Sequence, residues 1–305
     1  MRVLVTGGAG FIGSNAVRML CDEGHEVVVL DDLSFGYEEF VDRRGRLIRA
    51  SFDDLEILDA ELPGTEVVMH FAASSIIQFA FERPTEYVHN NLTRGVALLE
   101  AMRRHGVRRM VFSSTASVYG EPVRVPIDEE DPKNPAQAYG ASKLGFEAML
   151  SAYYHAYGIS STSFRYFNAY GPNDEQQPVT RAVPRWIKAA LLDEPLVLYW
   201  GGRQVRDYVY VEDIVRAHLL AMAVDGCRRY NLGSGTGVVM RDLAEEIVRR
   251  TRSRSPLVDG GERPGDPSRL VAGTERVRRE LGWAPRVPRD AALEETIRFY
   301  RARVR

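Results

Sequence analysis

Short apolar runs alternate with longer amphipathic segments from the N-terminus to about residue 172. Runs rich in β-branched residues predict strands at 2–6, 26–30, 66–71, 107–113 and 160–166, with a weaker one at 46–49. Apolar positions at helical spacing predict helices at 11–23, 85–105 and 136–157. Apolar strands that alternate with helices are typical of a parallel sheet covered on both faces. We therefore expect an α/β protein with a Rossmann-type, doubly wound parallel sheet.

The pattern changes after about residue 172. Prolines recur at short intervals, at Pro172, Pro178, Pro184 and Pro195. A strand is predicted at 195–200, and the segment 256–288 has the composition of loops. We expect a first domain over 1–172, with returning segments near 204–225, and a smaller C-terminal α+β domain over 173–305.

Composition and charge narrow the classes of function. The 305 residues carry 40 Lys and Arg against 42 Asp and Glu, so no overall basic field favours nucleic acid or an anionic membrane. No apolar run is long enough to cross a membrane, and no signal peptide is expected. Two cysteines fit a reducing compartment, so we expect a cytoplasmic protein. The six histidines show no metal-ligand spacing, and no metal site is expected.

A glycine-rich turn follows the first predicted strand. Gly8, Gly10 and Gly13 form G-x-G-x-x-G, and Gly7 extends the motif. Glycines there allow a tight turn and close backbone approach to a pyrophosphate, which the N-terminus of the next helix attracts. Asp31 follows at the end of the second strand, where a carboxylate accepts hydrogen bonds from ribose hydroxyls. No Arg lies between residues 31 and 39 to meet a 2′-phosphate, so the turn predicts NAD rather than NADP.

A second motif carries candidate catalytic groups. Tyr139 and Lys143 form Y-x-x-x-K in a predicted helix, four residues apart and therefore on one helical face. An ammonium beside the phenol lowers the pKa of the phenol and makes it a base for an alcohol proton. Thr115 ends a predicted strand, at the edge of the sheet where ligands bind, and can offer its hydroxyl to the same substrate oxygen.

These motifs belong to a longer series that resembles a known family. The chain is similar to the extended short-chain dehydrogenase/reductases of the NAD-dependent epimerase/dehydratase family, and among them to the UDP-glucose (UDP-galactose) 4-epimerases. The resemblance spans nearly the whole chain, in the family's order, through VTGGAGFIGS (5–14), DDLSFG (31–36), HFAAS (70–74), RPTEYVHNN (83–91), FSSTASVYG (112–120), YGASK (139–143), RYFNAYGP (165–172), QVRDYVYVEDI (204–214) and RPGD (263–266).

The resemblance implies interconversion of UDP-glucose and UDP-galactose by transient oxidation at C4 with tightly bound NAD. Tyr139 would take the O4 proton, with Lys143 tuning it and Thr115 as its hydroxyl partner. The first domain would bind NAD through Gly7, Gly10, Phe11, Ile12, Gly13, Asp31, Asp32, Leu33, Ser34, Gly36, Ser51, Phe52, Phe71, Ala72, Ala73, Ser75, Asn90, Ser113, Tyr139, Lys143 and Tyr166. The C-terminal domain would mainly hold the UDP-sugar, which is expected to contact Thr115, Tyr139, Asn168, Leu198, Tyr199, Arg206, Arg263 and Asp266.

Several positions depart from the family's pattern. Ser51 and Phe52 stand where an Asp and an aliphatic residue usually meet the adenine, and Ser75 stands at a site that is often basic. Leu270 lies near the position that limits bulk at the sugar C2, and its intermediate size leaves N-acetylated sugars open as substrates.

Other activities of the family have weaker support. A 4,6-dehydratase would have an Asp-Glu pair where Ala116 and Ser117 follow Thr115, and a UDP-glucuronate decarboxylase would have a Glu at Ser117. A uronate 4-epimerase would have an Arg soon after YGP, but the first Arg there is Arg181, after an acidic stretch. A non-catalytic NAD-binding regulator would not need the tyrosine base. Helices 85–105 and 136–157 resemble those that pair in the family's dimers, so we expect a homodimer. The resemblance also implies a role in galactose metabolism.

Overall fold

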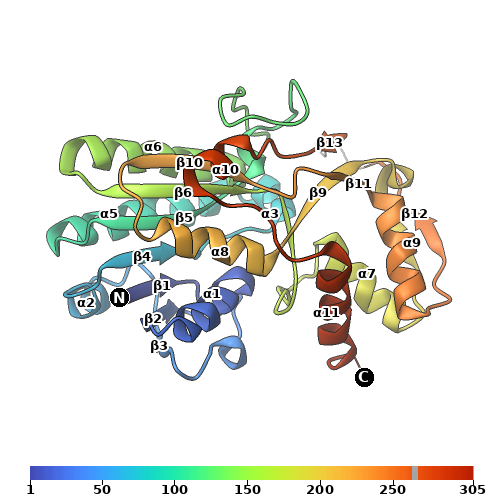
Figure 1. The fold of residues 1–305 in the computed structure, drawn as a ribbon, viewed down its shortest axis with the longest axis horizontal. Coiled ribbons are helices and arrows are strands. Elements are labelled where there is room, and N and C mark those ends of the chain that lie inside the picture. Colours follow the sequence, from blue (N-terminus) through green and yellow to red (C-terminus); the bar gives the residue numbers. More distant parts are fainter. Residues whose placement is uncertain (263–266, 305) are drawn as a thin grey trace.

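The computed structural model describes residues 1–262 and 267–304. A seven-stranded parallel sheet in the order β10-β6-β5-β4-β1-β2-β3 forms the N-terminal part (Figure 1). Its strands are β1 (Arg2–Thr6), β2 (Glu26–Asp31), β3 (Arg46–Arg49), β4 (Val67–His70), β5 (Arg109–Thr115), β6 (Ser160–Tyr166) and β10 (Cys227–Leu232). The order changes direction between β1 and β4, and this is where ligands bind in open parallel sheets. The expected doubly wound fold is confirmed.

Two layers of helices cover the sheet, because alternate strand residues point to opposite faces. Val3 and Val5 of β1 face one apolar core, whereas Leu4 between them faces the other. The first core is completed by α1 (Phe11–Asp22), α8 (Val211–Ala221) and α10 (Glu275–Leu281). The second is completed by α2 (Leu55–Glu61), α5 (Arg94–Arg104) and α6 (Ala138–Tyr157).

Some element boundaries differ from the sequence prediction. The helix expected at 85–105 is divided into α4 (Pro84–Val88), a π-helical turn (His89–Thr93) and α5, and α3 (Ile77–Glu82) precedes it. Strand β10 was not predicted, because Arg228, Arg229 and Asn231 hide its strand pattern. The structure buries Asn231 through hydrogen bonds, including one from its side chain to the carbonyl oxygen of Ile127 (2.9 Å).

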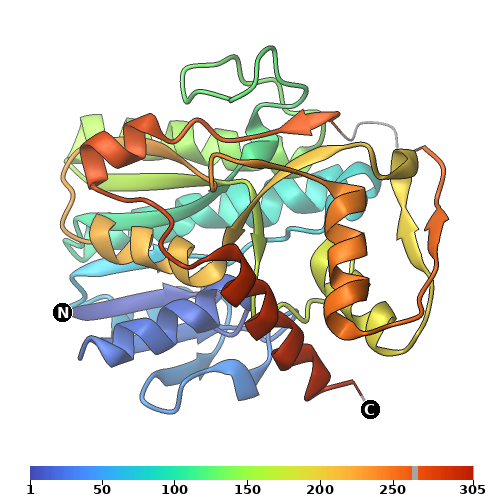
Figure 2. The same ribbon diagram turned by 45° about the vertical axis from the view of Figure 1, so that its right-hand side comes forward.

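A second, smaller part lies at one end of the main sheet, as Figure 2 shows from another side. One small sheet has the order β11-β9-β13, with β7 also paired to β9, and another joins β12 to β8. The strands are β7 (Asn168–Tyr170), β8 (Leu196–Leu198), β9 (Val205–Tyr210), β11 (Gly237–Val239), β12 (Leu257–Asp259) and β13 (Arg269–Leu270). Helices α7 (Ala182–Leu191), α9 (Met240–Thr251) and α11 (Arg289–Arg301) share a third apolar core.

The segments after residue 204 alternate between the two parts. Strand β9 pairs within the smaller sheet, α8 packs on α1, and β10 pairs with β6 as an outer strand of the main sheet. The expectation that residues 256–288 are loops was wrong in part, because α10 lies within them and Val277 is fully buried. Within the described ranges, no helix is long and apolar enough to cross a membrane.

Candidate active site

A cavity of about 1280 Å³ opens at the carboxyl ends of the main strands, between the two parts of the chain. The turns after β1, β2 and β4 line one half, and residues of β8, β9 and α9 line the other. The end of β5 and the start of α6 lie in the same wall. A cavity of this size and position suits a dinucleotide together with a second ligand.

The glycine turn is built for close contact with a ligand. Gly7 has a φ of 73°, which a residue with a side chain rarely adopts. A β-carbon on Gly13 would lie 2.1 Å from the carbonyl oxygen of Gly7, so that position excludes every other residue. Helix α1 begins directly after Gly10, and its free N–H groups face the cavity end of the turn. This cradle fits the pyrophosphate of a dinucleotide.

Two carboxylates stand at the end of β2. Asp31 accepts hydrogen bonds from the backbone N–H groups of Ala9 and Leu33, each at 2.9 Å, which fixes it beside the glycine turn. Burial raises the pKa of Asp31. Asp32 accepts from the backbone N–H of Ser34 at 2.9 Å. Carboxylates here suit ribose hydroxyls and repel a 2′-phosphate, so the residues present fit NAD.

Most of the predicted cofactor residues line this cavity together. Those that do are Gly7, Gly10, Phe11, Ile12, Gly13, Asp31, Asp32, Ser34, Gly36, Phe52, Phe71, Ala72, Ala73, Ser75, Asn90, Ser113, Tyr139, Lys143 and Tyr166. Leu33 and Ser51 do not. Leu33 occupies the tight turn after β2 with a φ of 59°, and the Ser51 hydroxyl is bonded to Asp53 and Arg94. Arg94 instead reaches the cavity, and its guanidinium lies 4.7 Å from the Phe52 ring centroid.

The predicted substrate residues line the opposite half of the cavity. Asn168, Leu198, Tyr199 and Arg206 all contribute to its wall, as does Leu270. Asn168 donates from its side chain to the carbonyl oxygen of Asp207 (3.1 Å), which orients it. Arg263 and Asp266, which the sequence assigns to the same ligand, lie outside the described residues.

The catalytic candidates meet where β5 ends and α6 begins. The neighbouring Thr115 side chain lowers the pKa of the Tyr139 phenol, as does the charge of Arg181. Burial has the larger effect, however, and raises the pKa of Tyr139. The sequence predicted a lowered pKa, and that expectation was wrong for this structure because it did not account for desolvation.

Lys143 is buried against the end of β5. Its side chain is 1% exposed, and Nζ donates to the carbonyl oxygen of Ser113 at 2.7 Å and lies 4.6 Å from the Phe112 ring centroid. Burial lowers the pKa of Lys143 to about 7, against an opposing effect of Glu147. The ammonium is thus held at the strand end, next to the residues that line the cavity.

Arg181 is the functional candidate that the sequence considered and gave no role. Its guanidinium lines the cavity and is held by both carboxylate oxygens of Asp174, with Nε at 2.9 Å from each. Asp174 is buried, and its carbonyl oxygen accepts from the Tyr300 hydroxyl at 2.5 Å. The arginine belongs to the loop before α7, so its sequence position alone did not place it near Tyr139.

Across residues 1–262 and 267–304, no group of three or more His, Cys, Asp or Glu side chains is arranged to hold a metal ion. The side chains that line the cavity include the cations Lys143, Arg94, Arg181, Arg185 and Arg206.

Comparison with known proteins places the chain in a family. Residues 3–233 match the model of the NAD dependent epimerase/dehydratase family, and the chain belongs to that family. It is 40% identical, over 93% of its length and 91% of the relative's, to the UDP-glucose 4-epimerase of Corynebacterium glutamicum.

Solved structures give the same result. The chain matches the UDP-glucose 4-epimerase of Thermotoga maritima with UDP-glucose, with a TM-score of 0.95 and 33% identity over 100% of both chains. It also matches the UDP-glucose 4-epimerase of Thermus thermophilus in complex with NAD, with a TM-score of 0.91 and 36% identity over 99% of both. The expected family is confirmed.

Proposed function

We propose that this chain is an NAD-dependent epimerase that interconverts UDP-glucose and UDP-galactose by transient oxidation at C4. One observation carries the proposal. Tyr139 and Thr115 are neighbours in the wall of a cavity that the glycine turn and Arg206 also line. Full-length relatives at 34–40% identity that act on UDP-glucose support the choice of substrate.

The cofactor is NAD, which the N-terminal part of the cavity fits. Residues 1–172 would hold it, with the backbone of the glycine turn at the pyrophosphate and Asp31 and Asp32 at a ribose. Lys143 would reach the second ribose. When bound, NAD supplies the hydride acceptor and donor for C4 of the sugar. The substrate is neither oxidised nor reduced overall, so the cofactor stays bound between turnovers.

Tyr139 would accept the proton of the sugar O4 and later return it. Thr115 orients this transfer, because its hydroxyl contacts the phenol while its Oγ1 also accepts the backbone N–H of Ser117 at 3.1 Å. The charge of Arg181 favours the phenolate that the transfer requires. A general base works best when its pKa lies near the working pH, so Arg181 offsets part of the effect of burial on Tyr139.

The nucleotide end of the substrate would be held mainly by residues 173–305. Arg206 is buried, and a planar guanidinium suits a diphosphate. Leu198 and Tyr199 would border the uracil, Asn168 would contact the sugar nucleotide, and Arg263 and Asp266 are proposed for the diphosphate and ribose. Firm binding of UDP leaves the sugar free to turn between its two faces.

The direct test is turnover of UDP-galactose by purified protein with no added NAD, followed by chromatography of UDP-glucose. We expect conversion by the wild type and a loss of about 100-fold or more in Tyr139→Phe, which removes the general base. Tyr119→Phe is the matched control, because it removes a buried phenol hydroxyl that hydrogen-bonds to Asn231 outside the cavity. Near-normal turnover by Tyr139→Phe would refute the role of the base.

Rival substrates and reactions can be run as parallel arms. Ala116 and Ser117 line the cavity after Thr115, so no carboxylate stands there to eliminate water from C5–C6. UDP-N-acetylgalactosamine tests whether Leu270 admits bulk at C2. UDP-glucuronate tests whether Arg181, already bound by Asp174, accepts a second carboxylate. A 4-keto-6-deoxy product would replace the epimerase proposal by a dehydratase.

We also propose that the chain is a homodimer that acts in the cytoplasm in galactose metabolism. Both cysteines are free thiols, which supports a reducing compartment. Within the segment 85–105, Leu99 is fully buried in its own chain, whereas Val88 of α4 is 41% exposed and remains available for pairing. Sedimentation equilibrium measures the oligomeric state directly.

A further inference from the structure

Three side chains on one face of α6 contact three consecutive residues at the end of β5. Tyr139, Lys143 and Glu147 are spaced four residues apart and form a stripe along the helix. Tyr139 lies next to the side chain of Thr115, which acts on the pKa of its phenol, and Lys143 Nζ donates to the carbonyl oxygen of Ser113. Glu147 contacts Ser114, the residue between these two, because Ser114 Oγ donates to Glu147 Oε1 at 2.5 Å.

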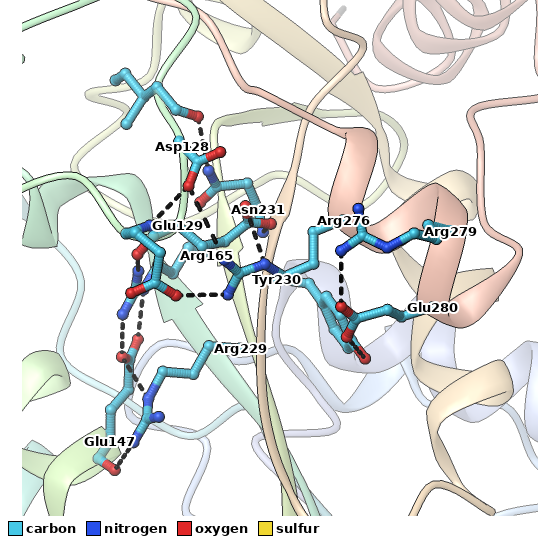
Figure 3. A network of polar contacts seen from close by, with 12 residues as sticks. Asp128, Glu129, Glu147, Arg165, Arg229, Tyr230, Asn231, Arg276, Arg279 and Glu280 are labelled. Atoms are coloured by element: carbon cyan, nitrogen blue, oxygen red, sulfur yellow. Dashed lines mark hydrogen bonds and ion pairs between the residues drawn. The ribbon is translucent and has the colours of Figure 1, made fainter.

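Glu147 is as deeply buried as the lysine one turn before it, at 1% exposure. Figure 3 shows its carboxylate facing two guanidinium groups. Arg165 of β6 donates to it through Nε at 3.0 Å and Nη2 at 2.6 Å, and Arg229 of β10 approaches with Nε at 3.5 Å. A carboxylate in an apolar layer needs such partners to stay charged. The ion pair therefore fixes Glu147 in place, one helical turn after Lys143.

The charges around Lys143 come from several elements. His70 of β4 is buried and neutral, because burial and the Lys143 charge lower its pKa to about 3. Tyr166 of β6 is also neutral, because burial raises its pKa well above its usual value. Arg165 adds positive charge from β6. In the described part of the chain, Glu147 is the anion that acts on the Lys143 ammonium, and it opposes the effect of burial.

We infer that Glu147 is a positioning residue for the catalytic pair: its carboxylate joins the reactive face of α6 to the end of β5 and balances the buried charge of Lys143. The inference rests on the proposed function for its catalytic meaning. The geometry on which it depends is independent of the substrate, since all three contacts lie within the protein.

Removal of the negative charge has a defined electrostatic consequence. Glu147→Gln keeps the size of the side chain but leaves Arg165 and Lys143 as buried cations without the carboxylate between them. The protonated form of Lys143 then loses its stabilising partner, so its pKa falls. The ammonium is lost at a lower pH, and the alkaline limb of the kcat profile moves toward lower pH. A purely structural ion pair would reduce stability without moving either quantity.

The pKa of Lys143 can be measured directly. The chain has three lysines, Lys133, Lys143 and Lys188. In NAD-loaded protein with ¹³C-labelled lysine, NMR follows the side-chain resonances through a pH titration, and Lys143→Arg identifies the signal of Lys143. We expect its pKa to fall by about one unit or more in Glu147→Gln, and to stay near the wild-type value in Glu147→Asp, which keeps the charge.

Glu129→Gln is the matched control. Glu129 is buried in the same network, where Arg165 donates to its backbone carbonyl (3.1 Å) and Arg276 faces its carboxylate (3.7 Å), as Figure 3 shows. Its charge does not act on Lys143 as that of Glu147 does. We expect Glu129→Gln to reduce stability and to leave the pKa of Lys143 unchanged. An equal fall in both variants would overturn the inference, as would an unchanged pKa in Glu147→Gln.

A second variant covers loss of folding. If Glu147→Gln does not fold, the double variant Glu147→Gln with Arg165→Gln removes both charges of the pair and is compared with Arg165→Gln alone, and we expect the lower Lys143 pKa in the double variant. Equal pKa values in these two variants contradict the inference. The titration needs no turnover, so its result is distinct from a failure of the proposed function. A fall in the pKa of Lys143 in a protein that converts no UDP-sugar would refute the proposed reaction and leave the charge balance standing.

Discussion

At Gly13 of the glycine turn, any side chain would clash with the backbone. A β-carbon on Gly13 would lie 2.1 Å from the Gly7 carbonyl oxygen and 2.9 Å from the α-carbon of Gly8. Both atoms belong to backbone, which cannot move aside like a flexible side chain. Gly10, in the same turn, provides the contrast, because a β-carbon there would lie 3.4 Å from the same oxygen. We therefore predict that Gly13→Ala disrupts the turn and that Gly10→Ala does not.

The expected magnitude follows from the clash. Overpacking of a well-packed region costs about 1–3 kcal/mol, and the upper end applies here because the backbone of the turn must shift. Since 1 kcal/mol corresponds to about 2–4 °C for chains of 150–250 residues, we expect the Tm of Gly13→Ala to fall by about 5 °C or more. In the wild type, NAD at 100 times its Kd adds about 2.7 kcal/mol, and Gly13→Ala loses this gain as the cradle deforms.

Thermal unfolding of protein freed of its bound NAD, followed by circular dichroism with and without saturating NAD, measures both effects. Gly10→Ala is expected to unfold within about 1 °C of the wild type in the absence of NAD, because a substitution without a clash changes stability little. The increase in Tm on addition of NAD then separates the binding effect from the folding effect. The reasoning is wrong if Gly13→Ala has the wild-type Tm and retains the full increase with NAD.

The remaining predictions concern charge and packing. Arg181 lowers the pKa of Tyr139, so Arg181→Gln should raise that pKa and move the acid limb of the kcat profile to higher pH. Arg181→Lys, which keeps the charge, should restore the wild-type profile. An acid limb that does not move in Arg181→Gln contradicts this role. Trp283 is 1% exposed and donates to the Asp213 carbonyl oxygen at 2.8 Å, so Trp283→Ala should lower the free energy of unfolding by about 3–5 kcal/mol in urea denaturation. The control is Leu220, which is 46% exposed, and Leu220→Ala should change the free energy of unfolding by no more than about 0.5 kcal/mol. Similar losses of stability in Trp283→Ala and Leu220→Ala would refute the packing argument.

Local features of the site could be predicted from the sequence. The glycine turn lies between a strand and a helix that adjacent residues define, and Asp31 ends the following strand, so both reach the cavity as expected. The two buried faces of the main sheet also follow from alternation along single strands. Leu33 and Ser51 are the predicted cofactor residues that do not line the cavity. Leu33 adopts a left-handed turn, and the Ser51 hydroxyl is hydrogen-bonded to Arg94.

The sequence by itself determined the elements whose information lies within a few residues: the strands with period two, the helices with period 3.6, the glycine turn and the spacing of Tyr139 and Lys143. The tertiary structure decided what depends on distant segments. It placed β10 beside β6, brought Arg181 toward Tyr139, and set Glu147 between Ser114 and Arg165. It also reversed the expected pKa shift of Tyr139, because desolvation depends on everything packed around a group and not on its neighbours along the chain.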